Sequence, residues 1–312
     1  MEYRKLGLSD LEVSAVGLGT WALGNDYFGE VDDAESIAAI QAGLDAGINL
    51  IDTAPAYGAG HAEEIVGKAI QGRRDQVVVA TKAGVIRTKD DFIKTLKPES
   101  IRKEIDDSLR RLNVDVIDLY QIHWPDPKTP LEDALEEFVK IREQGKYRYL
   151  GVSNFSTQEM DKAREMAGIV SLQPQYSLLK RKIENNILPY CRKYNLGVLS
   201  YGTLAGGILT GKYREIPEFE EGDNRADFYP FFKEPTWSKV QKFLDVPREM
   251  AEKKGLTVAQ LAINWTLSQA GITSALVGAK HPKQAQENAA AGDLKLSARE
   301  LDRIEEATTF LR

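Results

Sequence analysis

The stretches INLID (residues 48–52), VVVATK (77–82) and IDLYQIH (117–123) decide the fold of this chain. Each is an apolar run of strand length that ends in one polar residue, which is Asp52, Lys82 or His123. The hydrophobicity of these runs is continuous and not alternating, which indicates strands buried on both faces, as in a parallel sheet. Because the carboxyl ends of parallel strands meet at one edge, we expect the three polar side chains to lie close together.

Similar apolar runs recur along the chain and alternate with amphipathic stretches of helical period. We expect eight strands, at residues 15–20, 49–52, 76–81, 116–123, 149–153, 171–175, 197–201 and 272–277. Clear helical patterns lie between them at 33–46, 98–112, 131–144 and 157–167. Thr129 is placed to cap the third of these helices, with Pro130 at its first position.

Eight strand–helix alternations fit either a closed (β/α)8 TIM barrel or an open doubly wound sheet. Polar or reactive residues follow seven of the eight runs, and a closed barrel is the architecture that points all such ends at one mouth. We therefore expect an α/β barrel, formed by residues 1–312 as a single domain. An N-terminal β-hairpin at 2–14 should cover its bottom, and a long loop insertion should follow strand 7 at 203–236. The polar residues at the strand ends are Thr20, Asp52, Lys82, His123, Ser153, Asn154, Gln175 and Tyr201.

The bulk composition excludes several classes of protein. The chain has 41 basic and 47 acidic residues and a net charge of −6, which argues against a partner that is a nucleic acid or a membrane surface. The N-terminus lacks the apolar core of a secretion signal, and the only cysteine, Cys191, suggests a reducing compartment and a buried thiol. Three scattered histidines make a metal site improbable. These features are typical of a cytoplasmic enzyme that is a monomer or a weak homo-oligomer.

Asp52, Tyr57, Lys82 and His123 together have the composition of a proton-donating site. Reduction of a carbonyl group needs an acid, and a nearby ammonium is expected to lower the pKa of a tyrosine from about 10. We interpret Tyr57 as the general acid, Lys82 as the group that tunes it, and Asp52 as the partner that fixes Lys82. His123 would orient the carbonyl. Taken singly, the four could equally be a loop anchor, a packed phenol, a solvated charge and a core histidine.

The motifs GLGTW, DTAPAYG, ATKAG, SLRRLNVDVIDLYQIHWPD, GKYRYLGVSNFS, QPQYSLL and LSYGTLAGGILTGK resemble the aldo-keto reductase superfamily. The resemblance runs from about Tyr3 to Phe310 and is closest to bacterial NADPH-dependent reductases of the general-stress and inositol-cluster type. It implies that the catalytic tetrad of the family falls on Asp52, Tyr57, Lys82 and His123. The implied substrate is a small-molecule carbonyl compound.

The resemblance also implies a site for NADPH. Ser153, Asn154 and Gln175 would bind the nicotinamide carboxamide, Tyr201 would stack on the ring, and Lys280 would bind the 2′-phosphate. Many family members carry Lys-Ser at 278–279 and Arg at 284, so this chain lacks some of their phosphate donors. The remaining implied contacts are Thr20, Trp21, Asp52, Gly202, Thr203, Leu204, Ala205, Gly206, Gly207, Ile208, Lys212, Arg225, Gly278, Ala279, Gln284, Glu287 and Asn288.

The substrate pocket should be lined by aromatic residues from loops, namely Trp21, Tyr27, Phe28 and Trp124. The aromatic cluster at 228–232 could join this lining or could pack the insertion onto the barrel. Gly17 and Gly19 with Ala22 fit a dinucleotide-binding fingerprint, but no helix pattern begins at once, as that fingerprint requires. Two other functions stay open, a cofactor-binding regulatory subunit with little turnover and a Schiff-base enzyme that uses Lys82.

Overall fold

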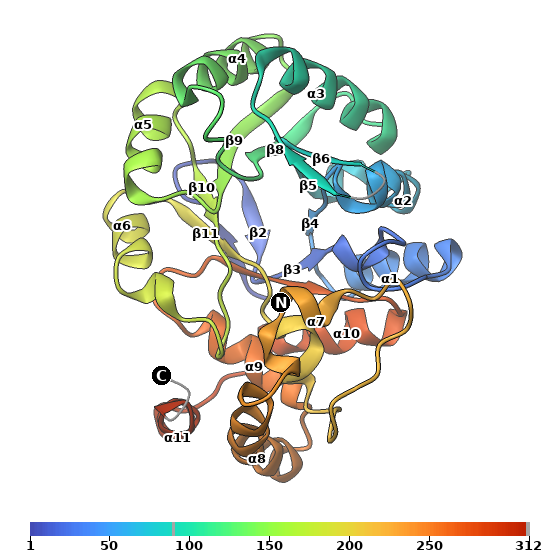
Figure 1. Cartoon of the computed structure of the whole chain (residues 1–312), viewed down its shortest axis with the longest axis vertical. Coiled ribbons are helices and arrows are strands. Elements are labelled where there is room, and N and C mark those ends of the chain that lie inside the picture. The colour runs from blue at the N-terminus through green and yellow to red at the C-terminus, as the bar shows by residue number, and fades with distance from the viewer. Residues whose placement is uncertain (89–90, 310–312) are drawn as a thin grey trace.

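The computed structural model describes residues 1–88 and 91–309, so Phe310, where the resemblance ends, lies outside the described residues. Eight parallel strands close into one barrel (Figure 1). Around the barrel the strands are β3 (Val16–Gly19), β4 (Leu50–Asp52), β5 (Val78–Ala83), β8 (Ile117–Ile122), β9 (Tyr147–Ser153), β10 (Ser171–Gln173), β11 (Gly197–Ser200) and β12 (Ser274–Gly278). The barrel closes where β12 pairs with β3, with Val277 opposite Leu18.

The expected (β/α)8 barrel is confirmed, and each strand lies within two residues of its expected position. The structure excludes a dinucleotide-binding fingerprint at Gly17 and Gly19, as expected. Strand β3 ends at Gly19, a short 3-10 turn follows at Trp21–Leu23, and the first α-helix begins only at Asp33.

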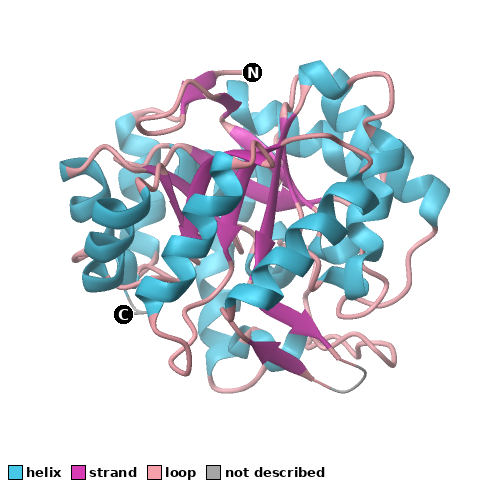
Figure 2. Ribbon diagram, turned by 90° about the horizontal axis from the view of Figure 1, so that it is seen from above, coloured by secondary structure: helices cyan, strands magenta, loops and turns pink. Residues whose placement is uncertain are grey.

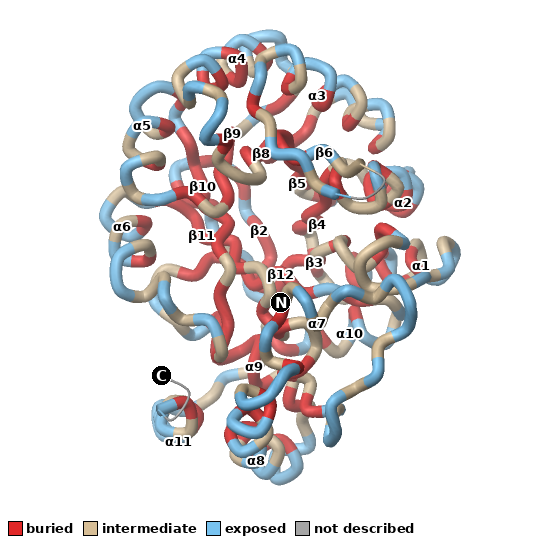
Figure 3. Tube along the Cα trace, in the orientation of Figure 1, coloured by how far each residue is buried: buried red, intermediate tan, exposed pale blue. Residues whose placement is uncertain are grey.

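A ring of helices covers the outside of the barrel, and the tube in Figure 3 shows buried strands inside helices whose outer faces are exposed. The expected capping residue of α4 is wrong by one position. Pro130 takes the cap position and Thr129 donates its hydroxyl proton to Asp126 Oδ2 at 2.7 Å, so Thr129 does not cap the helix. The helices are α1 (Asp33–Asp45), α2 (His61–Ala69), α3 (Pro98–Leu112), α4 (Leu131–Glu143), α5 (Thr157–Ala167), α6 (Ile187–Lys193), α7 (Arg225–Phe228), α8 (Thr236–Lys254), α9 (Val258–Leu267), α10 (Pro282–Ala290) and α11 (Ala298–Ala307).

A different hairpin lies at each end of the barrel, as Figure 2 shows. The expected N-terminal hairpin pairs β1 (Tyr3–Lys5) with β2 (Glu12–Ser14), and Leu6, Leu11 and Val13 pack against the inward residues of the barrel strands. A second hairpin, β6 (Val85–Arg87) with β7 (Phe92–Lys94), was not expected. It follows β5, so it stands at the carboxyl ends of the strands and borders the mouth of the barrel.

The expected insertion after β11 is present and contains short elements of secondary structure. It contains 3-10 turns at Ala205–Thr210 and Pro230–Phe232 and the short helix α7, and it leads into α8. The insertion also reaches the loop that follows β3. Phe28 and Asp223 form an isolated antiparallel bridge, and Asn224 N donates to Tyr27 O at 2.9 Å. These contacts join two loops over the mouth of the barrel.

Three further observations concern the described residues as a whole. Cys191 is a free, buried cysteine, and burial raises the pKa of its thiol to about 12. Within residues 1–88 and 91–309, no cluster of three His, Cys, Asp or Glu side chains is arranged to hold a metal ion. None of the described helices is both long enough and apolar enough to cross a membrane.

Candidate active site

The side chains of Asp52, Tyr57 and Lys82 meet at the carboxyl end of β4 and β5. Lys82 Nζ donates hydrogen bonds to Asp52 Oδ2 at 2.7 Å, to Thr53 O at 2.9 Å and to the Tyr57 hydroxyl oxygen at 3.2 Å. The ammonium has no exposed surface, so these three acceptors replace its hydration. His123 completes the group, since its ring stands edge-on to Tyr57 with the centroids 5.9 Å apart.

Two glutamines that the sequence analysis missed hold the other oxygen of Asp52. Gln173 Nε2 donates to Asp52 Oδ1 at 2.7 Å, and Gln121 Nε2 donates to the same oxygen at 3.1 Å. Gln121 lies two residues before His123, and Gln173 two residues before Gln175. The period-2 alternation of a strand places each on the same face as the residue that was predicted, and this signal could have found them. Gln175 itself lies beside Gly202 and forms a bridge with Tyr201.

The electrostatics keep the Tyr57 phenol and the His123 imidazole uncharged. Burial, reinforced by the carboxylates of Asp52 and Asp26, raises the pKa of Tyr57 well above its usual value. The expectation of a lowered Tyr57 pKa is therefore wrong for this site, because burial and the two carboxylates outweigh the Lys82 ammonium. Burial also lowers the pKa of Lys82, and Asp52 opposes that effect. Burial, then Lys82 and Lys94, lower the pKa of His123 well below its usual value.

Aromatic rings gather beside Tyr57. The Trp21 ring stacks on Tyr27 at 4.9 Å and on Tyr57 at 6.0 Å between centroids, and it meets Phe28 edge-on at 5.0 Å. Phe228 from α7 also contacts Trp21, at 5.1 Å, so the insertion contributes to this aromatic cluster.

The other predicted aromatic residues have different surroundings. The Lys94 ammonium lies 4.0 Å from the ring centroid of Trp124. Within the segment 228–232, Tyr229 lines the neighbouring cavity, whereas Phe232 is buried against Tyr213 and Phe219. The segment therefore contributes both to the lining of this cavity and to the packing within the insertion.

A cavity of 550 Å³ extends from Asp52 and Tyr57 to the start of α10. Gly206 and Gly207 line its middle with φ values of 72° and 95°, a conformation that glycine adopts without strain and that brings the backbone close to a ligand. The predicted cofactor residues that line the cavity are Thr20, Trp21, Asp52, Tyr201, Gly202, Thr203, Leu204, Ala205, Gly206, Gly207, Lys212, Arg225, Gly278, Ala279, Lys280, Gln284, Glu287 and Asn288.

Other predicted cofactor residues do not line this cavity. Ser153 and Asn154 form a chain of hydrogen bonds with Tyr201, in which Tyr201 OH donates to Asn154 Oδ1 at 3.0 Å and Asn154 Nδ2 donates to Ser153 Oγ at 2.9 Å. Their polar groups therefore lie next to a residue that does line it. Ile208 has its side chain buried in the hydrophobic core, so only its backbone could contact a cofactor.

The end of the cavity near α10 carries the positive charge. Lys280 Nζ is half-buried and donates to Phe28 O at 2.6 Å, while its backbone N–H donates to Gln284 Oε1 at 2.8 Å. Arg225 is paired with Asp223, its Nε donating to Oδ1 at 2.8 Å, so its charge is largely offset. Lys212 has no carboxylate partner among the described residues. An elongated cavity with a glycine-lined middle and cations at one end fits a dinucleotide with phosphate groups.

Comparison with known proteins identifies the family of this chain. The model of the aldo/keto reductase family matches residues 15–309. Aldo-keto reductase YhdN of Bacillus subtilis (strain 168) is 42% identical over 287 residues, which cover 91% of this chain and 86% of the relative. An NADH-specific methylglyoxal reductase of Escherichia coli (strain K12) is 35% identical over 308 residues and covers 94% of each chain.

Solved structures show the same architecture. The glycerol dehydrogenase AKR11B4 from Gluconobacter oxydans is 41% identical with a TM-score of 0.89, over 98% of this chain and 94% of that one. An aldo/keto reductase from Klebsiella pneumoniae in complex with NADP and acetate is 31% identical with a TM-score of 0.76. The match covers 97% of this chain and 94% of that one. With its closed barrel, its buried Asp–Lys–Tyr group and these matches, the chain belongs to the aldo/keto reductase family, in which NAD(P)H reduces carbonyl compounds.

Proposed function

We propose that this chain is an NADPH-dependent reductase of aldehydes and ketones in which Tyr57 is the general acid. One observation carries the proposal. The Tyr57 oxygen accepts a hydrogen bond from the buried Lys82 ammonium at 3.2 Å, and Tyr57 lines the cavity. Since Lys82 can only donate in this bond, the phenol keeps its own proton for another acceptor.

Each residue of the site has a separate role in proton transfer. A bound nicotinamide would supply the hydride, and Tyr57 would give its proton to the oxygen of the carbonyl substrate. The Lys82 ammonium then stabilises the phenolate that remains, while Asp52 keeps Lys82 charged and in place. His123, as a neutral imidazole, donates a hydrogen bond that orients the carbonyl oxygen. General acid catalysis of this kind contributes about 10²–10⁴-fold to the rate.

Cofactor binding follows from the cavity. Tyr201 would stack on the nicotinamide, the glycines at 206–207 would approach the pyrophosphate, and Lys280 would leave the Phe28 carbonyl to bind the 2′-phosphate. The NADP complex of the Klebsiella pneumoniae protein supports this choice. The NADH-specific name of the Escherichia coli relative supports the opposite one. We propose NADPH because Lys280 and Lys212 both line the cavity and neither has a carboxylate partner among the described residues.

The aromatic cluster formed by Trp21, Tyr27, Phe28 and Phe228 supports aldehydes with apolar or aromatic substituents as substrates. A Schiff-base function of Lys82 is disfavoured by the burial of its amine and by its three hydrogen-bond acceptors, which hold it as an ammonium.

The test is a turnover assay with purified protein, NADPH or NADH, and a panel of aldehydes that includes 4-nitrobenzaldehyde, followed by the loss of nicotinamide absorbance. We expect turnover by the wild type, and no turnover by Tyr57→Phe although this variant still binds NADPH. Tyr149→Phe is the matched control, because its hydroxyl accepts from Asp10 N at the opposite end of the barrel. Cofactor binding without turnover on any carbonyl would instead support a regulatory role, and turnover by Tyr57→Phe would refute the general acid.

A further inference from the structure

Tyr57 stands at the start of a turn that is conformationally unfavourable. Gly58, Ala59 and Gly60 all have positive φ values, of 60°, 51° and 100°. Such a conformation is uncommon for alanine and persists only where surrounding contacts hold it. The turn directly determines where the phenol lies, because the peptide that links Tyr57 to Gly58 is part of it.

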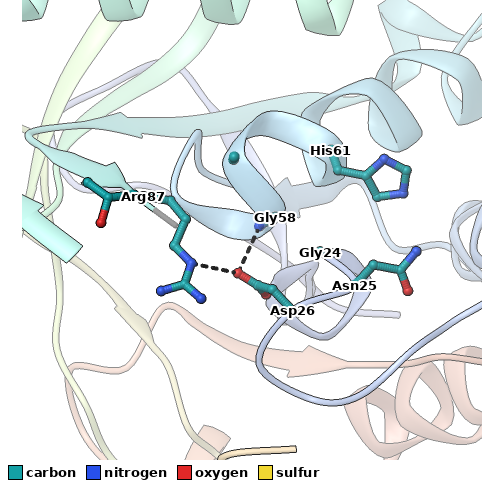
Figure 4. Close-up of a pocket in the computed structure, with 8 residues that line it drawn as sticks. Gly24, Asn25, Asp26, Gly58, His61 and Arg87 are labelled. Carbon is teal, nitrogen blue, oxygen red and sulfur yellow. Dashed lines mark hydrogen bonds and ion pairs between the residues drawn. The ribbon is translucent and has the colours of Figure 1, made fainter. Parts of the chain in front are cut away.

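The loop after β3 supplies these contacts. Gly24 packs so closely against the turn that a Cβ atom on Gly58 would lie 1.9 Å from Gly24 O. Next along the loop, Asp26 Oδ2 accepts a hydrogen bond from Gly58 N at 3.2 Å. Figure 4 shows the Asp26 carboxylate between Gly58 and the side chain of Arg87. The loop therefore touches the turn through both its backbone and one carboxylate.

Asp26 is itself held in place. Its Oδ1 accepts from Tyr27 N at 2.7 Å, and Arg87 Nε from β6 lies 3.5 Å from Oδ2. The side chains of Asp26 and Arg87 are only 14% and 22% exposed, so the pair is shielded from water. Burial raises the pKa of Asp26, while the Gly58 and Tyr27 hydrogen bonds and Arg87 lower it.

We propose that Asp26 is a positioning residue, which sets the Tyr57 hydroxyl against Lys82 by holding the Gly58 N–H. The inference rests on the proposed function, since it concerns the geometry of the same proton donor. The backbone of Tyr57 is fixed on its other side, where Tyr57 N donates to Ala54 O at 3.1 Å. Loss of the Asp26 carboxylate would free one side of the turn. Displacement of a reacting group by about 1 Å is enough to lower a rate by about 10²-fold.

The experiment compares Asp26→Ala with Asp26→Asn, which keeps an oxygen that can accept from Gly58 N–H. For Asp26→Ala we expect kcat to fall by about 10- to 100-fold while the KM for NADPH changes by less than about twofold. Asp26→Asn should restore kcat to within about threefold of the wild type. Glu30→Ala, an exposed acidic residue of the same loop, is the control and should leave both constants unchanged. Each rate is divided by the concentration of protein that binds NADPH, so that only folded enzyme is counted.

Two results would overturn the inference. One is an Asp26→Ala enzyme with wild-type kcat, and the other is an Asp26→Asn enzyme that loses as much activity as Asp26→Ala. If Asp26→Ala gives no folded protein, Asp26→Ser replaces it with the same two outcomes, because its shorter side chain cannot span the distance to Gly58. Absence of carbonyl reduction by the wild type would defeat the proposed function instead. A wild type that turns over, with an inactive Tyr57→Phe and a fully active Asp26→Ala, would defeat this inference alone.

Discussion

Replacement of Lys82 by methionine should strongly destabilise the fold, because it leaves the Asp52 carboxylate buried without its cation. Removal of one partner of a buried ion pair costs about 3–5 kcal/mol. Gln121 and Gln173 still donate to Oδ1 in this variant, and such hydrogen bonds to a charged group contribute about 1.5–3 kcal/mol each. We therefore expect a loss near the lower limit, about 3 kcal/mol of the free energy of unfolding. Every 1.4 kcal/mol is about tenfold in an equilibrium constant.

The measurement is urea unfolding followed by circular dichroism, on Lys82→Met, Asp52→Asn and the double variant. The double variant removes both charges, so its loss should be smaller than the sum of the two single losses by about 2 kcal/mol. Lys103→Met is the control, since the Lys103 side chain is 77% exposed and its pair with Asp107 should contribute less than about 1 kcal/mol. Losses that add to within about 0.5 kcal/mol would refute the reasoning, because they would show that Lys82 and Asp52 do not stabilise each other.

Three further predictions concern charge and backbone. Burial raises the pKa of Glu104 to about 7 from 4.5, so its contribution to stability is complete below pH 4.5 and is lost as the pH rises through 7. Between about pH 5.5 and about pH 8 the wild type should lose about 2 kcal/mol in urea unfolding that Glu104→Gln does not lose. Lys280→Ala should weaken NADPH binding by at least about tenfold, as one charged contact to a phosphate would, and NADH binding hardly at all; equal losses, measured by fluorescence titration, would exclude a 2′-phosphate contact. Gly58→Ala, which meets Gly24 O, should destabilise the fold by well over the about 1–2 kcal/mol expected for Gly72→Ala, whose φ is also positive at 77° but which has open space around it.

The barrel was predictable because the strands are mostly apolar runs, and polar residues follow seven of the eight. Continuous runs such as 48–52 and 77–82 can only be buried on both faces, and eight of them in alternation with helices leave few architectures. The capping residue of α4 was not predictable. Threonine is a common capping residue, but the Thr129 hydroxyl donates to the Asp126 carboxylate instead. This hydrogen bond depends on the conformation of a loop that the sequence does not predict.

The polar residues at the strand ends were predictable, but their electrical environment was not. Sequence order shows that Asp52 and Lys82 follow neighbouring strands, and the structure brings them to 2.7 Å. The sequence does not show how completely water is excluded from the site. This exclusion raises the pKa of Tyr57 despite the nearby ammonium. Gln121 and Gln173 were missed for a different reason. Each lies inside a strand and not at its end, although the period-2 alternation places it on the same face as a residue that was predicted.

The charges of the site are separated along the cavity, and this separation decides which part of a ligand each end can recognise. At the reaction end Asp52 and Lys82 offset each other, while Tyr57 and His123 are uncharged, so the tetrad has little net charge. A neutral, water-poor pocket strengthens the hydrogen bonds that act on a developing alkoxide. Lys280 and Lys212, which have no carboxylate partner among the described residues, can attract an anionic ligand at the other end of the cavity. Affinity for the phosphates of a cofactor can therefore change by mutation at that end without any change in the proton-donating group.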